Sequence, residues 1–268
     1  MSESQAALFS MQGKVVAIAG GTSGIGLAAA QACLEHGAKL VLCGRDDEHV
    51  QKARQLLGDS VLVVTGDVRD AALAQDTIKQ AVERFGSLDA LFHVAGGSGR
   101  RFGDGPLHEA TDDGWRETLA LNLDSVFFSN RAAIQQFLKQ ETGGVILNTG
   151  SVLGWSPAPH YFATHAYATA KAALAGLTRT TAAYYAQSQI RINLLAPALV
   201  ASPMSERALH QDEIMTYIQQ KQPIGPGIIE PDDLIGAVLY LLSDASKRVT
   251  GQVITVDAGW CVSEGETG

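Results

Sequence analysis

The chain has 268 residues, of which 46% are hydrophobic and 18% are charged, with 28 glycines and 8 prolines. This composition is typical of a soluble globular protein and excludes a disordered, collagen-like or coiled-coil chain. The net charge of −8 and the pI of about 5.3 argue against a general affinity for nucleic acid or an anionic membrane. The length allows a core that needs no disulfide or metal to fold.

Targeting and cysteine patterns point to the cytoplasm. The first 14 residues lack the basic start and apolar run of a secretory signal, and no stretch approaches ~18 uninterrupted apolar residues. The three cysteines, Cys33, Cys43 and Cys261, are far apart and are expected as buried thiols of a reducing compartment. We expect a cytoplasmic protein with no metal site and no membrane segment.

Short apolar or β-branched runs alternate with helix-patterned segments along the chain. Helical spacing follows the first three runs, at 25–36, 46–57 and 71–85. Runs without polar alternation suit strands buried on both faces, and strand–helix alternation implies right-handed βαβ units. The sequence therefore predicts an α/β fold, a doubly wound parallel sheet of seven strands with helices on both faces. The expected strands are 14–19, 39–43, 60–65, 88–94, 145–149, 190–195 and 252–256.

No linker, charge block or repeat divides the sequence. We expect one domain over residues 1–268, with a flexible N-terminus at 1–12. Three longer connections, at 95–111, 152–165 and 197–231, follow the ends of strands, where open α/β sheets bind ligands. Long connections at that edge are more often functional than idle.

A glycine-rich turn follows the first strand and opens a helix. It reads Gly20-Gly21-Thr22-Ser23-Gly24-Ile25-Gly26. Glycines let the backbone approach a pyrophosphate, and a helix N-terminus offers N–H groups and a partial positive charge. The position in the first βα unit favours phosphate binding over a merely structural turn.

The end of the second strand bears on the choice of dinucleotide. An acid about 20 residues past the glycines would bind the ribose 2′-OH of NAD, whereas Arg favours the 2′-phosphate of NADP. Gly44 stands there and Arg45 follows it. We expect NADP(H). NAD stays open because Asp46 could swing toward the ribose, and Arg45 could instead be a solvated residue beside a helix N-cap at Asp46.

Tyr167 and Lys171 are one helical turn apart, so they share one helix face. A phenol pKa near 10 is too high for a base at neutral pH, but a nearby cation favours the phenolate. In the reducing direction neutral Tyr167 would give its proton to a carbonyl oxygen. Tyr161 has His165 four residues on and is not expected to replace it. The alternative is an ordinary amphipathic helix face.

The glycine spacing, the Tyr167–Lys171 pair and the upstream Ser151 resemble the short-chain dehydrogenase/reductase family, in its branch of ~250-residue single-domain enzymes. The resemblance runs from about Gly13 to Trp260. It implies a Rossmann-like fold, a homotetramer, and hydride transfer between NADP(H) and a small carbonyl or secondary-alcohol substrate. Two other readings are an NAD-dependent sugar or polyol dehydrogenase and a non-catalytic nucleotide-binding relative.

The resemblance assigns two further catalytic residues. Ser151 would hold the substrate oxygen through its hydroxyl, although its separation from Tyr167 is longer than usual. Ser156 and Thr149 are weaker candidates for that position. Asn122 would join a water chain from the lysine to solvent, or would simply bend its helix through local hydrogen bonds.

The resemblance also implies the cofactor contacts. Asp67 and Val68 would line the adenine, Asp67 otherwise being a turn residue. Val200 and Ser202 would meet the nicotinamide amide. The full expected cofactor set is Gly20, Thr22, Ser23, Gly24, Ile25, Gly26, Arg45, Asp67, Val68, Ala95, Gly96, Tyr167, Lys171, Pro197, Val200 and Ser202.

The sequence departs from the family pattern in several places. Ala19 stands for a Thr, Ala198 for a Gly, and His93-Val94 for two asparagines; His93 is expected as a packed structural histidine. Arg100 and Arg101 could meet an anionic substrate or lie in a solvated loop. The aromatic residues of 155–165 suit a sugar, polyol or cyclic ketone, or else lid packing.

Overall fold

The computed structural model describes residues 8–58 and 60–264. Its centre is one parallel seven-stranded sheet with the order β3-β2-β1-β4-β5-β6-β7, so the fold prediction is confirmed. The strands are β1 (Val15–Ala19), β2 (Lys39–Gly44), β3 (Val61–Thr65), β4 (Ala90–His93), β5 (Gly144–Thr149), β6 (Ile190–Pro197) and β7 (Val253–Val256).

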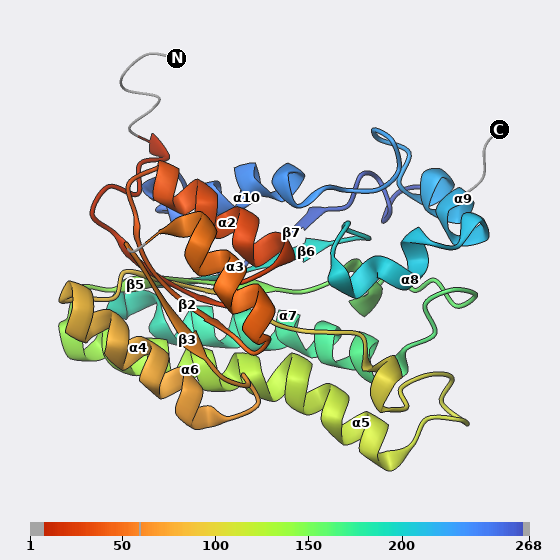
Figure 1. The fold of residues 1–268 in the computed structure, drawn as a ribbon, viewed down its shortest axis with the longest axis horizontal. Helices are drawn as coiled ribbons and strands as arrows, with labels where there is room; N and C mark the ends of the chain where they lie inside the picture. The colour runs from red at the N-terminus through yellow and green to blue at the C-terminus, as the bar shows by residue number, and fades with distance from the viewer. Residues whose placement is uncertain (1–7, 59, 265–268) are drawn as a thin grey trace.

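Helices cover both faces of the sheet (Figure 1). One layer holds α2 (Gly24–Glu35), α3 (Asp47–Leu57) and α10 (Ile235–Leu242). The other holds α4 (Ala71–Phe85), α6 (Ser125–Gln140) and α7 (His165–Tyr185), with α5 (Asp112–Leu119) leading into α6. The short helices α8 (Glu206–Leu209) and α9 (Asp212–Lys221) lie at the right of the view.

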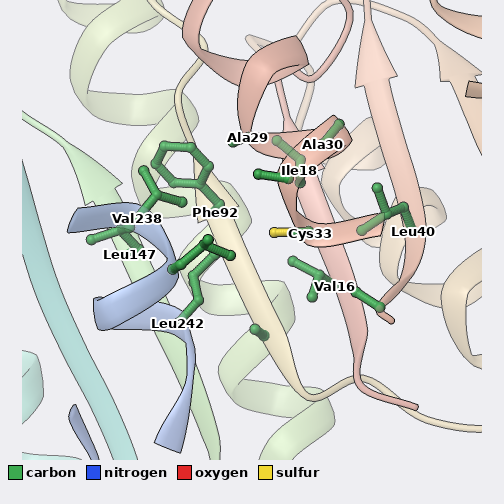
Figure 2. Packing of buried hydrophobic residues seen from close by; sticks show 14 of the residues in the cluster. Val16, Ile18, Ala29, Ala30, Cys33, Leu40, Phe92, Leu147, Val238 and Leu242 are labelled. Carbon is green, nitrogen blue, oxygen red and sulfur yellow. The ribbon is translucent and has the colours of Figure 1, made fainter. Parts of the chain in front are cut away.

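Alternate residues of each strand face opposite helix layers. Val16 and Ile18 of β1 belong to the core beneath α2 and α10, whereas Val15 and Ala17 belong to the core beneath α4 and α6. Because both faces are covered, all of β1 is buried, which explains the uninterrupted apolar run. Figure 2 shows the first of these cores, where β-strand side chains meet Cys33 of α2 and Leu242 of α10.

Two strand ends differ from the expectation by two residues, and the others differ by one residue at most. β4 starts at Ala90 rather than at 88, because the Leu88 N–H donates to the Gln140 side chain instead of to a strand. β6 continues beyond Leu195 to Pro197, because Ala196 and Pro197 still pair with β7. Both shifts come from contacts distant in sequence.

The strand order reverses at β1. The chain builds outward from β1 to β3 on one side and from β4 to β7 on the other. Open α/β sheets leave a crevice beyond the carboxyl ends of the strands at such a switch point. The three long connections return to that end and contain the single turns η1 (Gly99–Phe102), η3 (Val152–Gly154) and η5 (Pro203–Ser205).

Several expectations concern the ends of the chain and the thiols. Residues 1–7 of the expected flexible N-terminus lie outside the described residues, and Met11 is buried with its N–H bonded to the His36 carbonyl. Cys33 and Cys43 are buried, but Cys261 is partly exposed, because it lies in the C-terminal tail, after the last strand. Among residues 8–58 and 60–264, no helix combines the length and apolarity needed to cross a membrane.

Candidate active site

A cleft of about 700 Å³ lies at the carboxyl ends of the strands. Ser151 and every residue of the expected cofactor set line it, from the glycine turn to Ser202. Asn122, the remaining predicted residue, is fully buried behind the cleft wall. The fold therefore gathers residues from six different strand–helix connections into one cavity.

The glycine turn needs glycine at Gly20 and Gly26 for steric reasons. Gly20 has a φ of +87°, and a Cβ there would lie 2.7 Å from the backbone nitrogen of Ala95. A Cβ on Gly26 would collide with the Gly20 carbonyl oxygen. The turn consequently lies close against the end of β4, and the start of α2 packs against the turn.

The N-terminus of α2 is open to a ligand. Ser23, at its N-cap, makes no side-chain capping bond to the described residues. The first N–H groups of a helix have no intrahelical partner, so they can bind the oxygens of a pyrophosphate. The glycine cradle and these donors fit a dinucleotide.

The acids at the β2–β3 end of the cleft are already engaged. Asp46 caps α3 by accepting a hydrogen bond from the His49 N–H at 2.9 Å. Asp67 pairs with Arg69 at 2.7 Å and with Arg45 at 3.5 Å. The Arg69 hydrogen bond is the main reason that the pKa of Asp67 falls to about 2. Sequence reasoning missed Arg69, which also pairs with Glu117 of α5.

Arg100 and Arg101, which follow β4, interact with different sets of charged residues. Burial, followed by the positive charges of Arg45 and Arg69, lowers the pKa of Arg101. Burial and the charge of Arg207 lower the pKa of Arg100. Arg101 therefore interacts with the cations around Asp67, whereas Arg100 interacts with Arg207 of α8.

Tyr167 and Lys171 lie on the buried face of α7, with 8% and 3% of their surfaces exposed. The Lys171 ammonium lies 5.6 Å from the centre of the Tyr167 ring and donates to the Thr149 carbonyl at 2.8 Å. Burial raises the pKa of Tyr167, and a hydrogen bond with Ser151 acts in the opposite direction. Tyr167 is therefore protonated near neutral pH and can donate a proton.

Burial lowers the pKa of Lys171 from its usual 10.5 to about 8. The folded protein thus releases this proton at lower pH than the unfolded chain. We expect the free energy of unfolding to rise between pH 8 and pH 10.5, by about 3 kcal/mol from this group. Urea unfolding of the wild type and of Lys171→Met across this range isolates the contribution, because the variant lacks it. A constant difference between the two proteins would contradict the assignment.

Asn122 lies in a π-helical turn, Ala120–Asp124, between α5 and α6. Its amide nitrogen donates to the Gly97 and Thr118 carbonyls, both at 2.9 Å, and its oxygen accepts the Gly97 N–H at 3.1 Å. A Cβ on Gly96 would contact both Asn122 Oδ1 and Lys171 Nζ. Asn122 thus fixes the loop after β4 beside the lysine, and the bond to Thr118 is local to its own helix.

His93 links β4 to α6. Its ring is buried, with Nδ1 3.0 Å from the Ser129 hydroxyl and Nε2 3.3 Å from the Ser125 hydroxyl. Burial is the main cause that lowers its pKa to about 3, so the ring is neutral. These two hydroxyls show how the strand end is held without the asparagines typical of the family.

Asp104 is a residue that positions the start of α7, and sequence reasoning missed it. It is buried in the loop after η1, and its two carboxylate oxygens accept the N–H groups of Ala166 and Tyr167, each at 2.9 Å. Thr164, the N-cap residue of α7, makes no side-chain capping bond to the described residues, so Asp104 supplies the cap. The one sequence signal that could have indicated this residue is its acidic side chain in the 95–111 connection, at the ligand-binding edge of the sheet.

The 155–165 insertion packs as a lid. The Tyr161 and Tyr217 ring centres lie 5.1 Å apart, and those of Phe162 and Trp260 lie 6.1 Å apart. The Trp260 indole also donates to the Ser156 carbonyl at 3.2 Å. The insertion is therefore held by α9 and the C-terminal segment, with Phe162 at the cleft wall.

Together, a dinucleotide cradle and a buried phenol–amine–hydroxyl cluster on one cleft define an oxidoreductase that uses a nicotinamide dinucleotide. Among the residues that the structure describes, no group of three or more His, Cys, Asp or Glu could hold a metal ion.

Comparison with known proteins agrees with this class. The family model described as Enoyl-(Acyl carrier protein) reductase matches residues 19–261. The 2-(S)-hydroxypropyl-CoM dehydrogenase 3 of Xanthobacter autotrophicus is 35% identical, over 93% of this chain and 97% of the relative. The NADP-dependent (R)-specific alcohol dehydrogenase of Lentilactobacillus kefiri is 32% identical, over 93% and 97%. A short-chain type dehydrogenase/reductase structure from Mycobacterium ulcerans superposes with a TM-score of 0.85 at 25% identity, covering 95% of this chain and 92% of the other.

The chain belongs to the short-chain dehydrogenase/reductase family. It is an NAD(P)-dependent enzyme that acts on CH–OH groups.

Proposed function

We propose that the protein transfers a hydride between NADP(H) and a carbonyl or secondary-alcohol substrate, with Tyr167 as the acid/base. The observation that carries the proposal is the position of Tyr167, Ser151 and Lys171 on the same cleft as the glycine turn. The nicotinamide supplies or accepts the hydride, so this chain has to orient the substrate oxygen and move one proton.

The proton step follows from the local contacts. In reduction, the Ser151 hydroxyl holds the carbonyl oxygen and Tyr167 gives it the phenolic proton as hydride reaches the carbon. The resulting phenolate lies beside the buried Lys171 ammonium, which stabilises its charge. Asn122 positions the loop beside that ammonium and supports proton return from solvent.

The remaining predicted residues would hold the dinucleotide. Gly20, Thr22 and the start of α2 (Ser23, Gly24, Ile25 and Gly26) would contact the pyrophosphate. Asp67 and Val68 would border the adenine. Ala95 and Gly96 would support the nicotinamide ribose side of the cleft, and Pro197, Val200 and Ser202 the nicotinamide amide. Their common position on the cleft wall supports this assignment.

Cation excess around Arg45 supports NADP(H) as the preferred dinucleotide. Asp67 is shared between Arg45 and Arg69, and Glu117 also pairs with Arg69. Arg101 adds a third positive charge and makes no ion pair with the described residues, and Asp46 is occupied as the α3 cap. A 2′-phosphate would supply the negative charge that these guanidinium groups lack, whereas a ribose hydroxyl would not.

Fluorescence titration measures this preference. We expect NADPH to bind roughly 10- to 100-fold more tightly than NADH, the value of one charged hydrogen bond. Arg45→Gln should remove most of that advantage and leave NADH affinity nearly unchanged, and Arg116→Gln on α5 is the matched control. Equal or tighter binding of NADH to the wild type would contradict the NADP assignment.

A panel of ketones, aldehydes and secondary alcohols with both cofactors, followed at the nicotinamide absorbance, tests the activity. NADPH-linked turnover supports the proposal. Turnover with NAD of sugars or polyols alone would favour an NAD-dependent sugar or polyol dehydrogenase. Cofactor binding with no turnover anywhere in the panel would favour a non-catalytic nucleotide-binding relative.

We also propose a cytoplasmic homotetramer. Free thiols at Cys33 and Cys43 support a reducing compartment. The outer surfaces of α6 and α7 expose Phe127, Leu138 and Tyr184, which supports helix contacts between subunits.

A further inference from the structure

Two arginines on the cleft wall share one backbone carbonyl. Arg100 of η1 donates to the Tyr161 carbonyl at 2.9 Å, and Arg207 of α8 donates to the same oxygen at 3.1 Å. Both arginines line the cleft together with Ser151 and Tyr167. The connections after β4, β5 and β6 therefore converge on one point of the active-site cleft.

Neither guanidinium meets a carboxylate in the described part of the chain. Arg100 bonds to the Tyr161 carbonyl, and Arg207 bonds to that carbonyl and to the Gln211 side chain. The neighbouring acid Asp104 uses both oxygens to cap α7. These two cations thus differ from Arg45, which is paired with an acid.

The acidic side chains that line the cleft lie in its other part. Among the described lining residues the acids are Asp46 and Asp67, which contact His49 and the Arg45–Arg69 group. Arg100 and Arg207 thus place two positive charges in this region, which the buried Asp104 carboxylate offsets only in part through its effect on Arg100, although the whole chain has a net charge of −8.

A neutral carbonyl is a poor partner for two cations. The two positive charges on one oxygen repel each other, and an anion between them would attract both and offset that repulsion. Each guanidinium has five N–H donors, of which the bonds above use few, so donors remain for a second oxygen ligand. Guanidinium groups bind carboxylate, sulfonate and phosphate oxygens by parallel hydrogen bonds.

We infer that Arg100 and Arg207 form an anion subsite, and that the substrate of hydride transfer is a carbonyl or alcohol carrying an oxyanion group. The inference rests on the proposed function and names its substrate class. Apolar side chains also line the cleft, including Leu153, Phe162, Met204 and Trp260. They suit a hydrocarbon segment between the reacting carbon and the anion.

A matched ketone series tests the subsite. Ketones with the same carbon chain end in a methyl ester, a carboxylate, a sulfonate or a phosphate, and kcat/KM is measured with NADPH for each. We expect the best anionic member to exceed the ester by roughly 10- to 100-fold, the range of a charged hydrogen bond. The order among the three anions identifies which oxyanion the subsite takes.

Variants assign the effect to the two arginines. Arg100→Gln and Arg207→Gln should each lose roughly 10-fold or more in kcat/KM for the anionic ketone, mainly through KM, with a much smaller change for the ester. Arg116→Gln removes an equal charge from α5, outside the cleft, and should behave as the wild type. Added salt should reduce only the anionic advantage.

Binding supplies a readout that does not depend on turnover. A saturated carboxylate, sulfonate or phosphate of the same length should raise the Tm of the wild type with NADP⁺, and should not do so in Arg207→Gln. Equal kcat/KM for the ester and the anions, unaffected by either variant, would overturn the subsite and leave the proposed function intact. Loss of all ketone turnover while the saturated anions still bind would overturn the proposed function and keep the subsite.

Discussion

Replacement of Tyr167 by Phe is expected to lower kcat by about 10²- to 10⁴-fold while NADPH affinity stays nearly constant. The substitution keeps the buried ring beside Lys171 and removes only the hydroxyl that would carry the proton. Steady-state kinetics in both directions, together with a fluorescence titration of NADPH, measure the two quantities separately.

Tyr161→Phe is the matched control. It removes a phenolic hydroxyl from the lid, where the ring packs against Tyr217, and should keep most of the activity. If Tyr167→Phe retained more than about a tenth of the wild-type kcat, a role as proton donor would be rejected, because such catalysis contributes at least about 10²-fold.

Replacement of Ser151 by Ala is expected to lower kcat by about 10²- to 10³-fold, the usual effect of removing one donor to a developing oxyanion. The same change should alter the pH profile. The hydrogen bond from Ser151 lowers the pKa of Tyr167, so its loss should move the pH range over which alcohol oxidation rises, the acidic limb of the profile, to higher pH.

Ser156→Ala serves as the control for this position. Ser156 lies in the same connection, and it is its backbone carbonyl that holds Trp260, so loss of the hydroxyl should leave both kcat and the pH profile as in the wild type. A larger loss from Ser156→Ala than from Ser151→Ala would transfer the role to Ser156.

The sheet was predictable because its physical cause is local. Inner strands such as β1 are apolar runs buried on both faces, whereas the edge strand β7 is only partly buried. α4 begins and ends where its own residues signal, at the Asp70 cap and at left-handed Gly86. The short β4 was less predictable. Its start depends on the Leu88 N–H bonding to a glutamine 52 positions away.

The site residues that carry a spacing signal were predictable, and those fixed by the tertiary fold were not. The glycine turn and the Tyr167–Lys171 pair depend on backbone and helix geometry within a few residues. Asp104 caps a helix 62 positions further along the chain, and no local pattern indicates this contact. The division of Arg100 from Arg101 depends likewise on which distant cations each one meets.

The electrostatics of the pair also depend on burial, which the sequence does not reveal. Spacing suggests that Lys171 lowers the pKa of the Tyr167 phenol toward neutral pH. The main effect on the pKa of both groups is instead their removal from water. Burial raises the pKa of Tyr167 and lowers that of Lys171. The site is therefore set for proton donation to a carbonyl, and oxidation needs the positive ring of the oxidised nicotinamide nearby.

The central claim is that the reactive ring of the dinucleotide meets the Tyr167 hydroxyl in this cleft. A crystal structure of the enzyme with NADP⁺ tests it most directly. We expect the pyrophosphate at the start of α2, the 2′-phosphate beside Arg45, and the nicotinamide facing Tyr167 and Ser151. A nicotinamide bound outside the cleft, or directed away from Tyr167 with that side chain still buried, would contradict the account.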